Sequence, residues 1–500
     1  MSIENQQRRM SAAWVLAPAL LIASSLAAHA QTVVRSFDGD TGVELAACDE
    51  TKAHCKRYPE ADVGVSGKHV VQVTRQSVLF YDYSGKLLRS TPLAEFVASA
   101  GVELEPKSKG PVQPHIIFNE FIDRWMFSAS CKNDCVLVSE SSDPLGKWGG
   151  VSITCVAGGP CLGGNIAGHL GYDKNGLYYC ASHAGDPTDC FAVPTAQIAA
   201  IAQGKAPAHI NRKHDMPMEV YPAIDHNPQK AANAPAFFMA KTCGSEGRTK
   251  RENETGYCLK AVNSAFDWVV EAFTWNGTGG TWTEQLVKTD VGSKQNKWLY
   301  NTPCCGERQA VAQAGTDMLI RTGGSHRFNN IVQHGTKLHG AMGSGPCKAD
   351  CGAHGVDTNH IAIYVEMDCA NPAACVVSQT AKLSSADFAP LSATVGVDRD
   401  GNVGIAAASF TPQTNLSVLL WTRRKSDPPN TFRGPTTVVK GTQPYTCPPA
   451  DNVTLIGSSA GVLTALDPKD TTKLWTTQQF AGNAKTCAWN TRIFQYQVDM

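Results

Sequence analysis

The sequence predicts an all-β fold and, within that class, a single β-propeller stapled by disulfides. Short runs rich in β-branched and aromatic residues alternate with polar turns that contain Gly, Asn or Asp, as in antiparallel meanders. A unit of strand, Asp/Asn-Gly turn and strand recurs along the chain, for example around residues 173–176 and again around 398–402. Helical periodicity is almost absent. A meander that repeats along a long all-β chain is typical of a propeller, in which each blade is one such sheet.

One blade is clearest at residues 113–148. There the sequence reads as strands at 114–118, 123–130 and 134–139, with a fourth strand that opens at Trp148. Tight polar turns separate these runs, so consecutive strands are expected to pair with each other in antiparallel fashion. We interpret this stretch as a complete four-stranded blade.

The same reasoning, applied in chain order, predicts short helices at 92–100 and 196–204. Further strands are expected at 62–66, 69–74, 77–82, 167–183, 220–225, 236–242, 257–263, 268–275, 309–314, 318–322, 331–334, 337–342, 360–367, 376–383, 392–409, 416–423, 436–440, 453–456, 462–466, 474–480 and 492–498. At roughly 40–60 residues per blade the chain gives seven blades, with six or eight as alternatives. The last strand is expected to pair with early residues and close the ring, because closure removes exposed sheet edges.

The first thirty residues read as a secretory signal. Arg8 and Arg9 precede an apolar run at 12–27, and the small-residue motif Ala28-His29-Ala30 follows it, as at a cleavage site. No later run approaches the roughly 20 apolar residues that a membrane span needs. We therefore expect a secreted protein, periplasmic or extracellular. Its predicted parts are a signal peptide (1–30), an N-terminal strap (31–61) and the propeller (62–500).

Charge narrows the classes of partner. The chain carries 44 basic and 44 acidic residues, and no basic stripe stands out. Nucleic acid and anionic membranes are therefore poor candidates, because both are recognised through clustered positive charge. A neutral or mixed-charge partner fits better, and we expect a monomer.

The 18 cysteines indicate disulfides, since an exported chain meets an oxidising compartment. Close spacing suggests local bridges between strand ends, and Cys447 and Cys487 would then close the last blade. Cys304 and Cys305 would then bond either to each other, as a rigid vicinal disulfide, or each to a separate cysteine. The close pairs are Cys48/Cys55, Cys131/Cys135, Cys155/Cys161, Cys180/Cys190, Cys243/Cys258, Cys347/Cys351 and Cys369/Cys375.

Several separated pieces of the chain resemble a family of secreted bacterial propeller proteins. The family is loosely sialidase-like in architecture and mostly has no assigned activity. The resemblance implies a propeller scaffold, and it implies no particular chemistry. The pieces that carry it are Phe118-Asn119, Asp123-Arg124-Trp125, Ser141-Ser142-Asp143-Pro144 with Gly146 and Trp148, Gly171 to Gly176, Val397 to Asn402, Ser426-Asp427-Pro428, Leu474 to Phe480, and Trp489 with Thr491-Arg492-Ile493.

Two groups of residues are candidates for a site. The first surrounds Cys304-Cys305, where a flat disulfide would suit a sugar ring and arginines bind carboxylates in a bidentate manner. Its charged members are Glu307, Arg308, Arg321, His326 and Arg327. Ordinary surface ion pairs are the alternative reading of this group.

The second group consists of residues near predicted strand starts, which can line the mouth of a propeller channel. His115 and His169 are the candidate ligand-binding residues, and Asp215 and Glu219 in the segment between two blades are candidate acids. For each histidine, the alternative is an ordinary hydrogen-bonding role inside the fold.

No cofactor is expected. Asp398, Asp400 and Asn402, or the Asp38-Gly39-Asp40 run, could supply oxygen ligands to Ca²⁺. The alternative is stronger, because hairpin turns need these same residues.

The leading functional hypothesis is recognition of an extracellular glycan or cell-surface polymer at the channel mouth. The first alternative is a glycoside hydrolase or polysaccharide lyase acting on an acidic polysaccharide. In that case Glu219, Asp215 or Glu307 would supply the acid, and Arg308 or Arg321 would stabilise charge. The second alternative is an adhesion or protein-interaction module. No Walker, GxGxxG or HExxH motif is present in the sequence, which argues against the common nucleotide-binding and zincin classes.

Overall fold

The structure is a computed structural model in which the placement of most residues can be described. Residues Gln31–Met500 form one compact unit, and the predicted signal peptide lies outside the described residues. No helix among the described residues is long and apolar enough to cross a membrane. The described residues are 32–43, 59–102, 112–131, 134–156, 165–183, 188–216, 220–241, 267–288, 310–323, 328–344, 361–383, 390–446, 453–457, 463–482 and 488–498.

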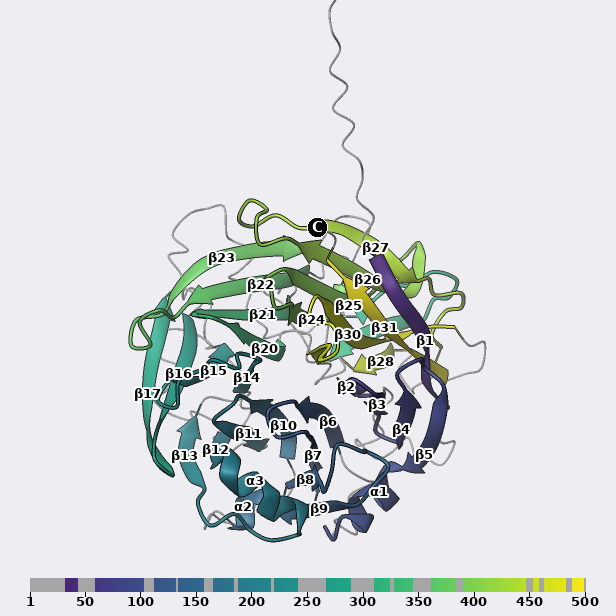
Figure 1. The fold of residues 1–500 in the computed structure, drawn as a ribbon. Helices are drawn as coiled ribbons and strands as arrows, with labels where there is room; N and C mark the ends of the chain where they lie inside the picture. Colours follow the sequence, from purple (N-terminus) through teal and green to yellow (C-terminus); the bar gives the residue numbers. More distant parts are fainter. Residues whose placement is uncertain are drawn as a thin grey trace, which may run out of the picture. The chain divides into compact units, whose positions relative to one another are not determined.

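The unit is almost all-β, and its strands form antiparallel meanders (Figure 1). Two of these meanders are joined into one sheet, because β14 pairs in parallel with β20. The sheets of the first half are β2–β5 (Asp62–Val65, His69–Val73, Ser77–Asp82, Leu87–Pro92), β6–β9 (Val112–Asn119, Arg124–Ser130, Cys135–Ser139, Trp148–Ser152) and β10–β13 (Asn165–Tyr172, Gly176–His183, Thr188–Pro194, Asn211–Met216). Those of the second half are β14–β17 (Tyr221–Asp225, Ala236–Lys241, Asp267–Asn276, Gly279–Lys288) with β20–β23 (Phe328–His334, Lys337–Ser344, Ile361–Asp368, Val376–Leu383), then β24–β27 (Pro390–Val397, Val403–Thr411, Thr414–Arg423, Arg433–Val439) and β29, β30, β31, β1 (Thr464–Leu466, Lys473–Phe480, Ala488–Gln497, Thr32–Val43).

The first strand of each meander contacts the first strand of the next one. We call β2, β6, β10, β14, β20, β24 and β29 the inner strands. Their contacts run in this order and return from β29 to β2, so the series is closed. In Figure 1 the inner strands gather near the middle of the view, and the later strands of each meander lie farther out.

The N-terminal strand completes the last sheet. β1 pairs with β31 in antiparallel register, with Thr32 opposite Gln497 and Phe37 opposite Ile493. In Figure 1 the two strands, purple and yellow, lie side by side. The prediction that the last strand pairs with early residues is confirmed. The pairing covers the outer edge of β31, which would otherwise expose unpaired backbone groups.

A small additional sheet consists of β18 (Ala310–Val311), β19 (Leu319–Gly323) and β28 (Val453–Gly457). Its strand β19 pairs with β18 as the predicted hairpin and with β28 in parallel. Because four residues separate β19 from β20, Gly323 can lie at most about 18 Å from Phe328. The small sheet therefore lies near the end at which β20 begins.

The hairpin turns follow the predicted Asp/Asn-Gly chemistry. Asp398 accepts hydrogen bonds through Oδ1 from the backbone N–H groups of Asp400 and Asn402, both at 2.9 Å. Gly401 has φ of 86°, a left-handed conformation that glycine adopts without steric cost. The side chain that was considered as a Ca²⁺ ligand is thus engaged in shaping its own turn.

Apolar side chains pack between neighbouring sheets. For example, Val71 and Phe80 from the β2–β5 sheet pack with Phe127 from the β6–β9 sheet. On the other face of the β6–β9 sheet, Met126 packs with Leu170 of β10. Strands that bury both faces in this way read as nearly continuous apolar runs.

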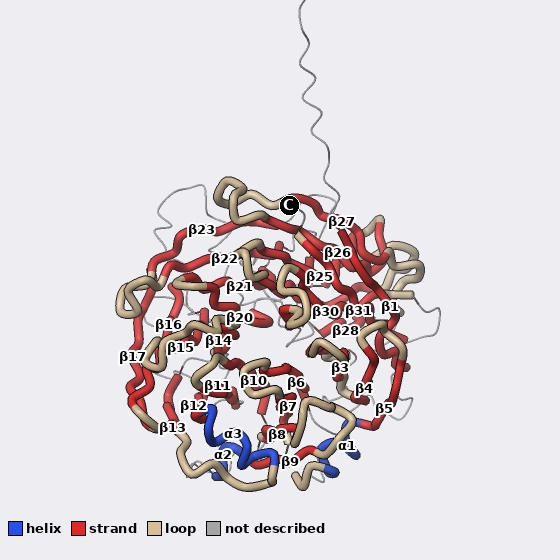
Figure 2. The backbone as a smooth tube through the Cα atoms, viewed as in Figure 1, coloured by secondary structure: helices blue, strands red, loops and turns tan. Residues whose placement is uncertain are grey.

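The two predicted helices are present at the edges of the sheets, drawn blue in Figure 2. The first is α1 (Leu93–Ser99), which buries Leu93, Phe96 and Val97. The second, α3 (Thr195–Ala202), buries Ile198 and Ile201. A third, single-turn helix, α2 (Ile153–Val156), was not predicted.

Three of the predicted close cysteine pairs form disulfides among the described residues. They are Cys131–Cys135, Cys180–Cys190 and Cys369–Cys375. Cys155 is also disulfide-bonded, to a cysteine outside the described part of the chain. The other predicted pairs, including Cys304 with Cys305, lie outside the described residues.

Candidate functional site

Four side chains from successive inner strands form a continuous row. They are Asp62 of β2, His115 of β6, His169 of β10 and Tyr221 of β14, and we call them the inner row. Nδ1 of His115 lies 3.4 Å from Oδ2 of Asp62. The rings of His115 and His169 have centroids 5.3 Å apart, and those of His169 and Tyr221 only 3.8 Å apart. The row therefore places two imidazoles and a phenol in contact.

Strand geometry explains why these residues meet. Neighbouring inner strands run in the same direction, because His169 within β10 lies against Tyr221 at the start of β14, while Tyr172 and His226 meet at the far ends of these strands. We call the two ends of the inner strands the start end and the finish end. Asp62 and Tyr221 lie at the start end, whereas His115 and His169 lie near the middle of their strands. Gln113, two residues before His115, has a left-handed φ of 53°, and the pairing of β6 with β7 shifts register between Val112 and His115. Such bulges re-aim the side chains that follow them.

Asp62 holds the row in place. Its Oδ1 accepts hydrogen bonds from the backbone N–H groups of Val63 and Leu463, both at 2.8 Å. Its Oδ2 accepts another from Ile116 at 3.0 Å. Burial raises the pKa of Asp62. The hydrogen bond to His115 and those from the backbone oppose this effect only in part, so the pKa remains above its ordinary value. Asp62 thus links three inner-strand segments and lies against His115, which makes it a positioning residue.

His115 retains unused hydrogen-bonding capacity. Its side chain is 1% exposed, and its Nε2 has no hydrogen-bond partner in the described part of the chain. The hydroxyl of Ser128, the residue opposite His115 on β7, likewise has none there. Leaving a buried polar group unpaired costs about 1–3 kcal/mol, and native proteins tolerate few such groups. His115 Nε2 and the Ser128 hydroxyl can therefore hydrogen-bond a ligand or a water molecule.

The remaining inner strands carry a different set of side chains. Thr394 of β24 donates a hydrogen bond to Oδ1 of Asn330 on β20 at 3.0 Å, and its hydroxyl lies 3.2 Å from that of Thr464 on β29. Asn330 also donates to the backbone oxygen of Val395 at 2.6 Å. These small polar groups bond to one another and to the backbone. The chemistry of the inner strands is therefore concentrated in the half that holds the histidines.

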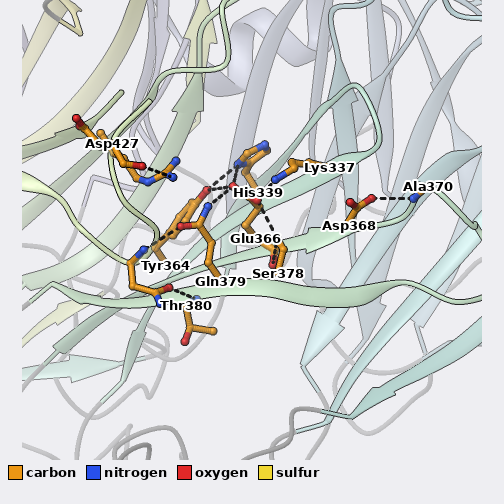
Figure 3. A network of polar contacts seen from close by, with 12 residues as sticks. Lys337, His339, Tyr364, Glu366, Asp368, Ala370, Ser378, Gln379, Thr380 and Asp427 are labelled. Atoms are coloured by element: carbon orange, nitrogen blue, oxygen red, sulfur yellow. Dashed lines mark hydrogen bonds and ion pairs between the residues drawn. The ribbon is translucent and has the colours of Figure 1, made fainter. Parts of the chain in front are cut away.

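A second buried polar network joins side chains of β21, β22 and β23 (Figure 3). Its centre is Glu366, which accepts hydrogen bonds from Tyr364 at 3.1 Å, Ser378 at 2.8 Å and Gln379 at 2.5 Å. Lys337 forms an ion pair with the same carboxylate. His339 lies 3.8 Å from it and 2.8 Å from the hydroxyl of Tyr364. Because its groups bond to each other inside one sheet, we interpret this network as structural.

The pKa values of the network follow from its geometry. Burial would raise the pKa of Glu366, but the hydrogen bonds from Lys337 and Ser378 and the nearby His339 hold it well below its usual range. Burial lowers the pKa of His339 and outweighs the attraction of Glu366. The network therefore holds Glu366 ionised and His339 neutral near pH 7.

The structure brings together two of the predicted site residues, His115 and His169. Asp215 lies in β13, the strand of its sheet farthest from β10, and Arg321 lies in β19 of the small sheet. The other predicted site residues lie outside the described residues: Glu219, Cys304, Cys305, Glu307, Arg308, His326 and Arg327.

Sequence reasoning missed Asp62 and Tyr221. Each is the first residue of an inner strand, so the rule that drew attention to His115 and His169 near strand starts would have found them too. Among the described residues, no group of three or more His, Cys, Asp or Glu side chains is arranged to hold a metal ion.

Comparison with known proteins gives no family. No protein-family model matches the chain, and no curated protein matches it. Solved structures that are similar include an ulvan lyase from a new polysaccharide lyase family (10% identity, 94% of this chain and 96% of that chain covered, TM-score 0.44). Others are a Kuenenia stuttgartiensis hydrazine synthase (10%, 85% and 94%, 0.40) and an α-L-arabinofuranosidase from Lactobacillus brevis (10%, 67% and 91%, 0.31). Similarities at these TM-scores do not support a functional assignment. The function of this chain is therefore argued from its own side chains.

Proposed function

We propose that the protein is a secreted, seven-bladed β-propeller that binds an acidic extracellular polysaccharide at the inner row. The blade number rests on the inner strands β2, β6, β10, β14, β20, β24 and β29, each of which leads one four-stranded meander in a closed series of contacts. The single observation that carries the functional part is the contact of His115, His169 and Tyr221 on three successive inner strands.

The chemistry of the row suits a sugar polymer. Imidazole and phenol groups donate and accept hydrogen bonds, which matches hydroxyl groups, and their flat faces can lie against a sugar ring. Arg321 is proposed to bind the carboxylate of an acidic sugar, because the small sheet that carries it lies near the start end.

We further propose that the protein cleaves the polymer by β-elimination. Hydrolysis of a glycosidic bond ordinarily uses two carboxyl groups about 5–10 Å apart. In the described part of the inner row Asp62 is the one carboxylate, and backbone N–H groups occupy it. Elimination needs a base and an acid that can be imidazole and phenol, and the row supplies both.

The proposed reaction acts on a uronate linked through its O4 atom. His169 removes the proton from C5, the electron pair of that bond forms the C4–C5 double bond, and the C4–O bond breaks. The electrons of the C4–O bond remain on the leaving oxygen, which Tyr221 protonates. His115, held by Asp62, accepts a hydrogen bond from a substrate hydroxyl at Nε2, and Arg321 binds the substrate carboxylate. His169 and Tyr221 are each 2% exposed, so the start end has to open when the polymer enters.

The experiment is incubation of the purified protein with a panel of neutral and uronate-containing polysaccharides. Ultraviolet absorbance reports the unsaturated product, and a reducing-end assay reports any cleavage. We expect absorbance to rise with one acidic polymer and to fall at least about 100-fold in rate in Tyr221→Phe and His169→Ala. His209→Ala, at an exposed histidine, is the matched control.

Three outcomes would contradict parts of the proposal. Binding without product would overturn the lyase assignment and leave the polysaccharide-binding role. Reducing ends without absorbance would point to hydrolysis instead. If no polysaccharide in the panel binds, the glycan function is wrong and a protein partner becomes the better hypothesis.

A further inference from the structure

A small cavity lies at the finish end of the inner strands, opposite the inner row. Its volume is about 90 Å³. A water molecule needs roughly 10–15 Å³ by the same measure, so the cavity has room for a ligand of several heavy atoms. We call it the finish pocket. It is lined by Val65, Phe118, Glu120, His226, Arg399, Leu466, Pro468 and Thr471.

The lining residues converge because inner strands end together. Glu120 follows β6, His226 follows β14 and Arg399 comes two residues after β24. Val65 is the last residue of β2, and Leu466 is the last residue of β29. The finish pocket is therefore built from the same ring of strands as the inner row, at the other end.

Glu120 and His226 form a dyad in this pocket. Oε1 of Glu120 lies 2.8 Å from Nδ1 of His226, and Oε2 accepts a hydrogen bond from the hydroxyl of Tyr172 at 2.6 Å. A carboxylate at Nδ1 favours the tautomer with its proton there, which leaves Nε2 of His226 as an acceptor. No described residue bonds to that Nε2 atom, and the His226 side chain is 17% exposed. The dyad therefore presents an ordered acceptor to the pocket.

Glu120 is ionised at neutral pH. Burial would raise the pKa of Glu120, but the attraction of His226 and the hydrogen bonds from His226 and Tyr172 lower it overall. Lys230 bridges the neighbouring carboxylates Asp173 and Asp225 at 2.8 and 2.9 Å and balances one of their two negative charges.

Arg399 supplies the opposite charge. Its backbone is fixed, since its N–H donates to the oxygen of Thr471 at 3.0 Å and its own oxygen lies 3.0 Å from Nε2 of His334. Its guanidinium group has no ion pair with any described residue, and its side chain is exposed. An arginine whose backbone is held in place and whose guanidinium is unpaired among the described residues can bind an anion.

We propose that the finish pocket is a second binding site, for a small hydroxylated carboxylate such as a free uronic acid. The ligand carboxylate pairs with Arg399, and its hydroxyl groups bond to Nε2 of His226 and to Glu120. Phe118 and Leu466 provide the apolar contact for the ligand's carbon atoms. The site is separate from the inner row and does not depend on the function proposed for it.

Calorimetric titration of the full-length protein with glucuronate, glucose and acetate tests this proposal. We expect glucuronate to bind, and glucose and acetate each to bind at least about tenfold more weakly, because each lacks one of the two recognised groups. Arg399→Gln and Glu120→Gln should each weaken glucuronate binding about tenfold or more. Lys425→Gln and Glu140→Gln, on the exposed surface, are the matched controls.

A thermal unfolding scan of each variant separates loss of binding from loss of folding. His169→Ala distinguishes the two sites, since it changes the inner row alone and should leave glucuronate binding unchanged. The proposal is overturned if glucuronate does not bind, if acetate or glucose binds equally well, or if the two finish-pocket variants bind as the wild type does. Loss of binding in His169→Ala would assign the ligand to the inner row instead.

Discussion

At the scale of single residues, one buried aspartate does more for the candidate site than the histidines that drew attention first. Asp62 accepts three backbone hydrogen bonds and lies 3.4 Å from His115. It thereby fixes the spacing of β2 and β6 and the position of the imidazole between them.

Replacement of Asp62 by Asn tests this role. The amide keeps one acceptor oxygen and turns the other into a donor, which faces a backbone N–H. We expect a loss of about 1–3 kcal/mol in the free energy of unfolding, measured by urea denaturation, together with weaker polysaccharide binding. Asp317→Asn, at an exposed position, is the control. An unchanged midpoint would show that Asp62 does not organise the row.

The Glu366 network predicts that the folded protein loses stability in acid. Burial lowers the pKa of His339, so the folded state holds this side chain neutral. Its contribution to the free energy of unfolding is therefore complete above the ordinary histidine pKa of about 6.5, and it is lost as pH falls below that value. Hydrogen bonds and nearby charge lower the pKa of Glu366 although burial would raise it. The contribution of Glu366 to the free energy of unfolding is therefore lost at lower pH, below the ordinary glutamate pKa of about 4.3. Both groups therefore make the protein less stable in acid.

The variant Glu366→Gln removes the ionised partner from this network. We expect a loss of about 2 kcal/mol at pH 7, from weaker bonds to Lys337 and Ser378. The decline in stability below pH 4.5 should also become shallower, because one proton-linked group is gone. Urea denaturation across a pH series measures both effects. Identical slopes in the two proteins would contradict the interpretation of Glu366.

At the scale of elements, the disulfides fasten strands that already pair. Cys180 and Cys190 stand directly opposite each other on β11 and β12, whereas Cys131 and Cys135 are separated by four positions at the start of β8. A disulfide stabilises chiefly by restricting the unfolded chain, and the restriction grows with the length of the closed loop.

Removal of each disulfide by double alanine substitution should therefore have unequal effects. We expect loss of Cys180–Cys190 to cost about 2–3 kcal/mol, and loss of Cys131–Cys135 to cost less. Thermal unfolding of the two variants makes the comparison. The reverse order would mean that packing around the sulfur atoms outweighs loop restriction at these sites.

At the scale of the whole molecule, β1 joins the N-terminal segment to the last sheet. Its pairing with β31 connects residues that are more than 450 positions apart, such as Thr32 and Gln497. Phe37 adds packing against the rings of Tyr81 and Trp475. The chain is thus held closed by a contact between its two ends.

Deletion of residues 32–43 should expose the edge of β31. We expect a lower unfolding temperature and concentration-dependent self-association, because an unpaired edge strand is a template for another chain. Light scattering and thermal unfolding measure the two effects. Arg35→Ala, which keeps the strand, is the control. A monomeric deletion variant of unchanged stability would show that closure does not depend on β1.

Much of the fold could be predicted from local signals. The strands of the 113–148 stretch, both longer helices, the Asp398 turn and the described disulfides each depend on residues that are close in sequence. Alternating apolar residues, turn chemistry and cysteine spacing all act over a few positions, so they can be read without knowing the tertiary arrangement.

The candidate site could be predicted only in part. His115 and His169 were identified from their place near strand starts, but nothing in the sequence says that their rings lie 5.3 Å apart. Asp62 and Tyr221 were missed because an aspartate or a tyrosine in a β-rich chain usually has an ordinary structural role. Their significance comes from neighbours that are about 50 residues away along the chain.

The sequence by itself determined that this chain makes repeated antiparallel meanders stapled by local disulfides, because those features arise from contacts between residues close in sequence. Only the tertiary structure decided which side chains of different sheets meet. The inner row, the finish pocket of Glu120, His226 and Arg399, and the pairing of β1 with β31 all join residues from separate sheets or from opposite ends of the chain. Such contacts depend on the order and direction of the inner strands around the ring, which no local pattern encodes.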